Sequence, residues 1–193
     1  MSQIPATNFR KFYERGDLPV VVSFSGANRK IVWKVDPEML DLHHYLPMFF
    51  EGLREVKEPY KFLAERSIDE ILEKCPQKIL PVLPQLVIPI KLALSTKIAE
   101  VIVVTLRKLQ NLIKCGNSIG QALVPYYRQI LPIMNLFKNK RSNMGDQMDY
   151  GQYKGSDICE LISQTLEMME LNGGEDAYIN IKYMIPTYES CMF

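Results

Sequence analysis

The sequence predicts a mainly α-helical protein, built as a short α-solenoid of helical pairs, with one small β-hairpin near the N-terminal end. Three observations lead to this fold class. Two β-rich runs flank a turn close to residue 27, and apolar residues then recur at helical spacing over much of the chain. A proline-containing pattern at residues 80–86 also returns at residues 124–130, as it does in proteins made of repeated helical pairs.

The composition is that of an ordinary globular protein. Of 193 residues, 47% are hydrophobic and 23% are charged, which is too apolar for a disordered chain. The 23 Lys and Arg residues nearly balance the 22 Asp and Glu residues, so we expect neither nucleic acid nor an anionic membrane as an electrostatic partner. The longest uncharged run of interest, residues 79–90, is too short to cross a bilayer, and we predict no transmembrane segment.

The chain divides into three parts. Residues 1–17 form a basic-aromatic N-terminal arm, residues 18–35 a β-hairpin, and residues 36–193 an α-helical repeat domain. Inside that domain, residues 139–155 are polar and aperiodic, which predicts a long loop.

In the hairpin, strands over 20–24 and 30–35 are joined by the turn Ser25-Gly26-Ala27-Asn28-Arg29. Because two strands alone are marginal in water, this hairpin must pack on another part of the chain or on a partner.

Capping residues predict the helix boundaries. Asp36 can cap a helix that has Pro37 at its first position, and Ser67-Ile68-Asp69-Glu70 matches a capping box that would open another helix. The clearest helix begins at Ser95 or Thr96 and ends at Gly116. Two more are predicted toward the C-terminus, one opening at Asp157 and ending at Asn172-Gly173-Gly174, and one from Glu175 to about Met184.

The repeat rests on prolines at helix starts. Leu80-Pro81 followed by Gln85-Leu86 corresponds to Val124-Pro125 followed by Gln129-Ile130, and Leu46-Pro47 opens a similar apolar stretch. The interval lies in the period range of HEAT and armadillo repeats, and proline is tolerated in the first turn of a helix. Coincidence in a proline-rich helical protein is the alternative explanation.

No motif for catalysis, cofactor binding or metal binding stands out. The two histidines, His43 and His44, are adjacent and point apart on a helix, and the sequence contains neither a Gly-rich phosphate loop nor a GxSxG nucleophile turn. The four cysteines match no zinc or redox spacing. Carboxylate pairs such as Glu167 with Glu170 are expected by chance on exposed helix faces. We therefore predict no catalytic residues, no cofactor and no metal.

What remains is surface chemistry. Two basic clusters could meet an acidic partner, or could simply be solvated; their members are Arg10, Lys11 and Arg15 in the arm, and Lys138, Lys140 and Arg141 at the start of the loop. Trp33 is the single tryptophan. It either packs the hairpin on the helices or anchors an interface, where Lys34 and Glu38 would form the rim.

Several long segments are similar to one known family. They are FRKFYERGD (9–17), LHHYLPMFFEGL (42–53), KILPVLPQLVIPIK (78–91), ALVPYYRQILP (122–132) and GGEDAYINIKYMIPTYESC (173–191). Together they resemble the Parkin co-regulated gene protein family over nearly the whole chain. The resemblance implies an armadillo/HEAT-like helical fold and a non-enzymatic protein of cilia and flagella, located in the cytoplasm, the cytoskeleton and the axoneme.

The resemblance also implies partners. Family members lie at the inner junction of axonemal doublet microtubules, where they contact α- and β-tubulin and alternate with a small β-rich ciliary protein. Longer members carry an extended N-terminal region, whereas here only residues 1–7 precede the matching segment.

Two functions follow as hypotheses. The first is a structural protein that bridges the A- and B-tubules, with Arg10, Lys11, Arg15, Lys138, Lys140 and Arg141 as the expected contacts to acidic tubulin. The second is a soluble helical-repeat adaptor that docks a small protein through the hairpin, with Trp33, Lys34 and Glu38 at the interface. An enzyme is the third possibility, and it would need a pocket lined by His43 or His44.

Overall fold

The computed structural model describes residues 7–25, 28–143 and 155–192; the side chains of residues 25, 28, 139–143 and 155–157 are outside this description. The described elements, in chain order, are α1 (Asn8–Arg15), β1 (Val20–Ser25), β2 (Asn28–Trp33), η1 (Pro37–Met39), α2 (Leu42–Glu51), η2 (Gly52–Arg54), α3 (Tyr60–Lys74), η3 (Pro76–Lys78), η4 (Leu80–Val82), α4 (Leu83–Leu94), α5 (Ala99–Lys114), α6 (Ile119–Leu123), η5 (Val124–Tyr126), α7 (Tyr127–Asn143), α8 (Gly155–Gly173) and α9 (Glu175–Met184). The prediction of a mainly helical chain with one N-terminal hairpin is confirmed.

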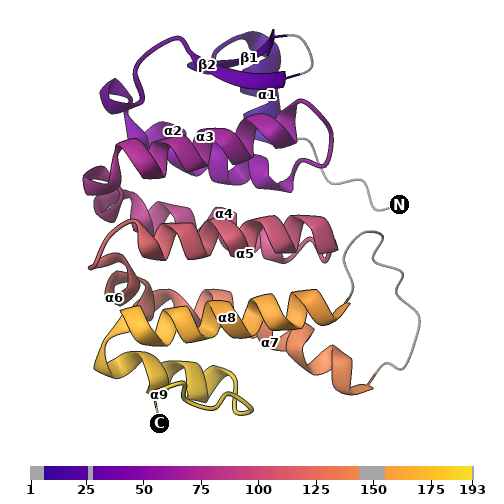
Figure 1. The fold of residues 1–193 in the computed structure, drawn as a ribbon, viewed down its shortest axis with the longest axis vertical. Helices are drawn as coiled ribbons and strands as arrows, with labels where there is room; N and C mark the ends of the chain where they lie inside the picture. The colour runs from indigo at the N-terminus through magenta and orange to yellow at the C-terminus, as the bar shows by residue number, and fades with distance from the viewer. Residues whose placement is uncertain (1–6, 26–27, 144–154, 193) are drawn as a thin grey trace.

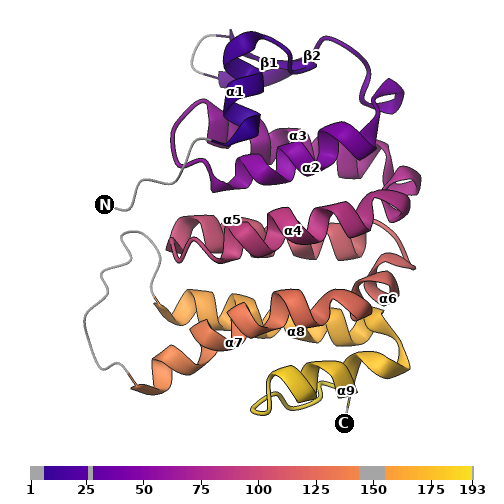
Figure 2. The same ribbon diagram turned by 180° about the vertical axis from the view of Figure 1, so that it is seen from behind.

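The helices lie in layers that follow one another along the long axis (Figures 1 and 2). Helix α2 pairs with α3, α4 with α5, and α7 with α8, while α9 forms the last layer at the C-terminal end. Between layers, α4 packs on both α2 and α7, and α5 packs on both α3 and α8. One continuous apolar core runs through these layers, so each helix buries its apolar side against its neighbours.

Two of the three proline-marked stretches start helices. Pro81 and Pro125 each lie in a short 3₁₀ turn, η4 and η5, and these turns lead directly into α4 and α7. At this position the missing N–H of proline costs no helical hydrogen bond. Pro47 differs, because it lies inside α2. The corresponding stretches therefore begin α4 and α7, which pack against each other in adjacent layers.

The hairpin packs on α3. β1 and β2 pair antiparallel, with Val20 opposite Trp33 and Val22 opposite Ile31. These four residues share one face, since facing residues of an antiparallel pair lie on the same side. Val20 is fully buried, and Val22, Ile31 and Trp33 contact the core. The support that a two-stranded hairpin needs thus comes from this chain.

Two sequence predictions were wrong in their boundaries. Ser67 does not open a helix but lies fully buried in the middle of α3, because the apolar stripe of this helix already begins at Leu63 and Ala64. The predicted loop at 139–155 begins too early, because helix α7 continues through Asn143. By contrast, the last helix has the predicted bounds, Glu175–Met184.

One helical segment, Pro76–Leu94, has the length and the mean hydropathy, 1.3, of a membrane span. It is interrupted, since it consists of η3, η4 and α4, and it carries Lys78 and Lys91. Leu83, Leu86 and Ile90 of this segment are buried, and α4 contacts α2 and α7. Its central place in the stack therefore accounts for part of its apolar character, since 44% of the segment's apolar window is buried.

Candidate protein-interaction site

The N-terminal arm is a helix docked on the first layer. Thr7 caps α1 by accepting a hydrogen bond from the backbone N–H of Arg10 at 3.1 Å. Phe9 is fully buried and its ring lies 5.8 Å from that of Phe49 in α2. This anchor fixes the orientation of the predicted basic residues, which lie on the remaining surface of α1.

The cations of α1 have local partners. Arg10 pairs with Glu14 at 2.8 Å, and its guanidinium lies 4.8 Å from the centre of the Tyr60 ring. The hydrogen bonds that Glu14 accepts from Arg10 and Tyr60 lower the pKa of that carboxyl group. Arg15 pairs with Asp17 at 2.6 Å and covers the Phe12 ring. Lys11 is exposed. Much of the positive charge predicted to meet tubulin is thus balanced within α1 and the turn after it.

The second basic cluster lies two layers away, at the end of α7. Lys138 is half-buried, with its ammonium 5.7 Å from the centre of the Tyr188 ring. Lys140 and Arg141 lie in the same helix, but their side chains are outside the described part. The structure therefore separates the predicted tubulin contacts into two sites on different layers, and their role in binding stays a prediction.

Trp33 packs inward. Its indole N–H donates a hydrogen bond to Glu70 Oε2 at 2.7 Å, and its ring meets the Phe49 ring edge-on with centroids 6.0 Å apart. Lys34 and Glu38 are both exposed. The Lys34 ammonium donates to the carbonyl oxygen of Gly16 at 3.0 Å, and the Glu38 carbonyl accepts from Lys78. The three predicted docking residues do not form one exposed patch around Trp33, and a docking role for them is untested.

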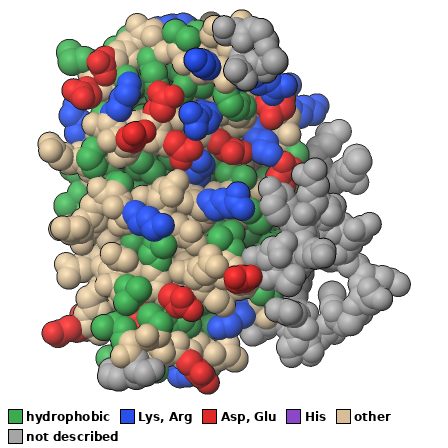
Figure 3. All heavy atoms as spheres, in the orientation of Figure 1, with side chains coloured by type: hydrophobic (Ala, Val, Ile, Leu, Met, Phe, Trp, Pro, Cys, Tyr) green, Lys and Arg blue, Asp and Glu red, His purple; other side chains and the backbone are tan. Residues whose placement is uncertain are grey.

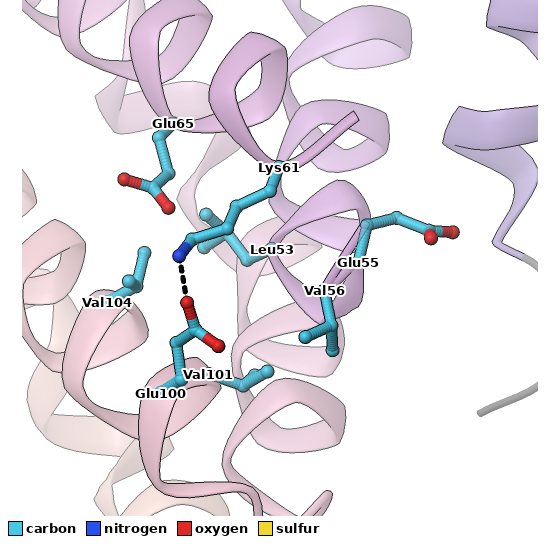
Figure 4. Close-up of a pocket in the computed structure, with 8 residues that line it drawn as sticks. All are labelled: Leu53, Glu55, Val56, Lys61, Glu65, Glu100, Val101 and Val104. Atoms are coloured by element: carbon cyan, nitrogen blue, oxygen red, sulfur yellow. Dashed lines mark hydrogen bonds and ion pairs between the residues drawn. The ribbon is translucent and has the colours of Figure 1, made fainter. Parts of the chain in front are cut away.

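A small pocket opens between α3, α5 and η2 (Figure 4). Its charged lining residues are Glu55, Lys61, Glu65 and Glu100, and Lys61 forms an ion pair with Glu100. Oε1 of Glu65 is buried without a hydrogen-bond donor, and burial raises the pKa of this carboxyl group. Neither His43 nor His44 lines this pocket.

The histidines lie elsewhere, exposed near the start of α2, where the His44 ring meets Phe12 edge-on with centroids 6.0 Å apart. Within the residues that the structure describes, no three His, Cys, Asp or Glu side chains come close enough together to hold a metal ion. All four cysteines are free, with Cys75 buried and Cys191 exposed.

The sequence interpretation missed the role of Glu170. This residue is only 3% exposed, and its carboxylate accepts hydrogen bonds from the Tyr188 hydroxyl at 2.6 Å, from the Ser190 hydroxyl and from the Cys191 N–H at 3.1 Å. Burial alone would raise the pKa of Glu170, but these hydrogen bonds outweigh it and lower the pKa. The C-terminal segment is thereby held on α8, and a chance carboxylate pair on an exposed face was the wrong interpretation.

The sequence interpretation also missed an exposed apolar stripe on α4, made of Pro84, Ile88 and Leu92. The four-residue spacing could have revealed it, because such positions share one side of a helix. It was missed because this segment was interpreted from its uncharged length and its prolines, and not from which residues share a helix face.

Comparison with known proteins identifies the family of this layered chain. The family model described as "ParcG: Parkin co-regulated protein" matches residues 7–190. The chain belongs to the Parkin co-regulated protein family. A mouse protein named "Parkin coregulated gene protein homolog" is 56% identical over 186 residues, which are 96% of this chain and 77% of the mouse protein. The family match begins at Thr7, the cap of α1, and ends at Ser190, so it includes both the docked arm and the segment held by Glu170.

Proposed function

We propose that this chain is a non-enzymatic structural protein of the doublet-microtubule inner junction. It binds α- and β-tubulin, bridges A- and B-tubule protofilaments, lies beside a small β-rich ciliary protein, and resides in the cytoplasmic axoneme of cilia or flagella. The observation that carries this proposal is membership of the Parkin co-regulated family along almost the entire chain, because the resemblance implies this role.

The architecture supports the proposal. The stacked pairs α2/α3, α4/α5 and α7/α8 are consistent with a short armadillo/HEAT-like α-solenoid, a class of fold that offers extended surfaces to partners. The two predicted basic clusters, on α1 and at the end of α7, belong to different layers of one body. A rigid body with separated contact sites suits a bridge between two protofilaments.

Weak individual contacts are sufficient for such a bridge. The net charge is only +1, so long-range attraction to tubulin is small. Simultaneous engagement of two sites on a lattice can raise the apparent affinity by roughly 100- to 10,000-fold over either contact alone. We therefore expect stable binding to microtubules and doublets, and weak binding to free tubulin dimers.

The test compares sedimentation of the full chain with microtubules against its affinity for free dimers. Charge reversal of Lys138, Lys140 and Arg141 to Glu should weaken lattice binding while circular dichroism stays unchanged. Its control is charge reversal of three exposed cations on α3 and α5, which are Arg66, Arg107 and Lys114. Equal affinity for free dimers and lattice would contradict the bridging role, and unchanged binding of the first variant would remove the α7 cluster from the contacts.

A second candidate function is an adaptor that docks a small protein through the hairpin. It is favoured by Val32, which is 47% exposed on the hairpin face that points away from α3 and lies two residues before Lys34. Phe24, 68% exposed near the turn, adds a second exposed apolar side chain. The variant pair Phe24→Asp and Val32→Asp should abolish binding of a small protein partner but leave microtubule binding intact if the two functions use separate surfaces. Loss of microtubule binding in this variant would instead assign the hairpin to the first function.

A further inference from the structure

Helices α2, α4 and α7 form one side of the stack, which faces the viewer in Figure 2. Each is backed within its layer by α3, α5 or α8, and α4 is flanked by α2 and α7. An exposed side chain on α4 therefore points away from α5 and out of the stack. This side is called the α2–α4–α7 face below.

The α2–α4–α7 face exposes no acidic side chain among the residues that the structure describes. Its exposed side chains are His43, His44, Pro84, Gln85, Ile88, Lys91, Leu92, Arg128, Gln129, Pro132 and Leu136. Two acids flank these helices at the ends of α2. Asp41, the exposed N-cap, accepts a hydrogen bond from the His43 N–H at 3.1 Å. Glu51, at the other end, is half-buried, pairs with Arg54 at 2.8 Å and accepts a hydrogen bond from the Asn8 N–H.

The opposite side has a different character. Helices α3, α5 and α8 expose both signs of charge, and Figure 3 shows red and blue side chains over that side. Their exposed charged residues are Arg66, Glu73, Lys74, Arg107, Lys114, Glu160 and Glu167. Since the whole chain has 23 basic and 22 acidic residues, an acid-free side does not follow from composition.

Apolar side chains lie at the centre of the α2–α4–α7 face. Ile88 is 60% exposed, and Leu92 and Leu136 are 44% and 45% exposed. Single exposed apolar residues are normal on protein surfaces, but these side chains, together with Pro84 and Pro132, occupy two adjacent helices. A desolvated apolar centre beside charged or polar groups is the usual anatomy of a protein–protein interface.

We propose that the α2–α4–α7 face docks on an acidic protein surface, and that under the proposed function, on which this inference rests, it is the side that lies against tubulin. Ile88, Leu92 and Leu136 lose their water at the centre of the contact. Lys91 and Arg128 meet carboxylates at its edge. Because none of the described side chains exposed on α2, α4 and α7 is acidic, an acidic partner meets less like-charge repulsion here than on the opposite side.

Two other occupants fit less well. A membrane surface is recognised by a dense cluster of four to eight Lys and Arg residues, whereas Lys91 and Arg128 lie on two different helices beside an apolar centre. A second copy of the chain would bring like-charged faces together, because a symmetric dimer uses the same patch on both subunits.

The experiment measures cosedimentation of the full chain with microtubules polymerised from purified tubulin. The double variant Lys91→Glu and Arg128→Glu should lower the affinity by about 10-fold or more, because both charge pairs become repulsive. Its control, Arg107→Glu with Lys114→Glu, changes the net charge equally on the opposite side and should change the affinity less than about threefold.

A second pair of variants tests the apolar centre. Ile88→Asp should weaken microtubule binding, whereas Ile179→Asp on α9 should not, although Ile179 is similarly exposed at 67%. Circular dichroism and thermal melting verify that each variant folds. If Ile88→Asp fails to fold, the charge variants alone test the proposal.

The outcomes separate the two proposals. Failure of the unaltered chain to bind microtubules would overturn the proposed function and this inference with it. Normal binding by both the Lys91/Arg128 and Ile88 variants would overturn only the inference and leave the proposed function standing. Two other outcomes would also overturn the inference, both with microtubule binding unchanged in these variants. Loss of binding to phosphatidylserine vesicles would assign the face to a membrane. Loss of a dimer, measured by light scattering, would assign it to a second copy of the chain.

Discussion

The hydroxyl of Tyr188 donates a hydrogen bond of 2.6 Å to the buried carboxylate of Glu170, and this bond joins the C-terminal segment to α8. The Ser190 hydroxyl and the Cys191 N–H donate to the same carboxylate. The Cys191 thiol is a fourth donor, at 3.3 Å. Four donors around one ionised group make the local contact strong, because hydrogen bonds to charged groups contribute more than neutral ones. Beside it, the Lys182 ammonium donates to the Tyr188 carbonyl oxygen at 2.7 Å.

Glu170→Gln should lower the free energy of unfolding by about 2–3 kcal/mol, because the remaining amide cannot accept all of these bonds as an ionised carboxylate does. Chemical denaturation at neutral pH measures the loss. The matched control is Glu167→Gln on the exposed side of α8, which should change stability by less than about 0.5 kcal/mol. Similar losses in both variants would show that Glu170 does not hold the C-terminal segment.

Glu170 and Glu65 should give opposite dependences of stability on pH. The pKa of Glu170 is lowered in the fold from 4.5, so its contribution is present at neutral pH and is lost as the pH falls through 4.5 and below. The pKa of Glu65 is raised from 4.5 by burial, so the folded state gains stability from this group as the pH falls from neutral toward 4.5.

The Glu65→Gln variant tests the second sign. At neutral pH it should be more stable than the unaltered chain by about 0.5 kcal/mol, a small value because water screens this partly exposed group. The advantage should vanish below about pH 4.5, where Glu65 is protonated in both states. Denaturation series at both pH values check it, with Glu73→Gln on the same helix as the control. An advantage that grows as the pH falls would refute the burial argument.

Trp33 is a built-in reporter of hairpin docking, because it is the single tryptophan and bonds to Glu70 of α3. Glu70→Ala leaves the half-buried indole N–H without its acceptor and should destabilise the fold by about 1–2 kcal/mol. It should also shift the fluorescence emission of Trp33 to longer wavelength as water enters. Glu73→Ala should leave the emission unchanged, and an unchanged spectrum in Glu70→Ala as well would mean that this bond does not hold the hairpin.

Much of the architecture could be predicted from local patterns. The hairpin, the helix from Glu175 to Met184 and the helix starts after Pro81 and Pro125 all carry their signals within a few residues. The capping box at Ser67 failed because a local capping motif competes with a longer apolar stripe, and burial along α3 prevails.

The contacts of the candidate surfaces could not be predicted in the same way. Pairings such as Trp33 with Glu70, or Glu170 with Tyr188, join residues from different elements, so the fold alone brings them together. The acid-free face has the same origin. Its residues come from three helices that are separated in sequence, and no window of the sequence contains them all.

The layered packing has a mechanical consequence. Helices α4 and α5 are held from both sides, whereas α9 has a packed layer on one side only in the described chain. Backbone amides should therefore exchange their hydrogens slowest in the middle pair and fastest toward the end. A protein of this kind can fray at its tips under load while its centre keeps its shape.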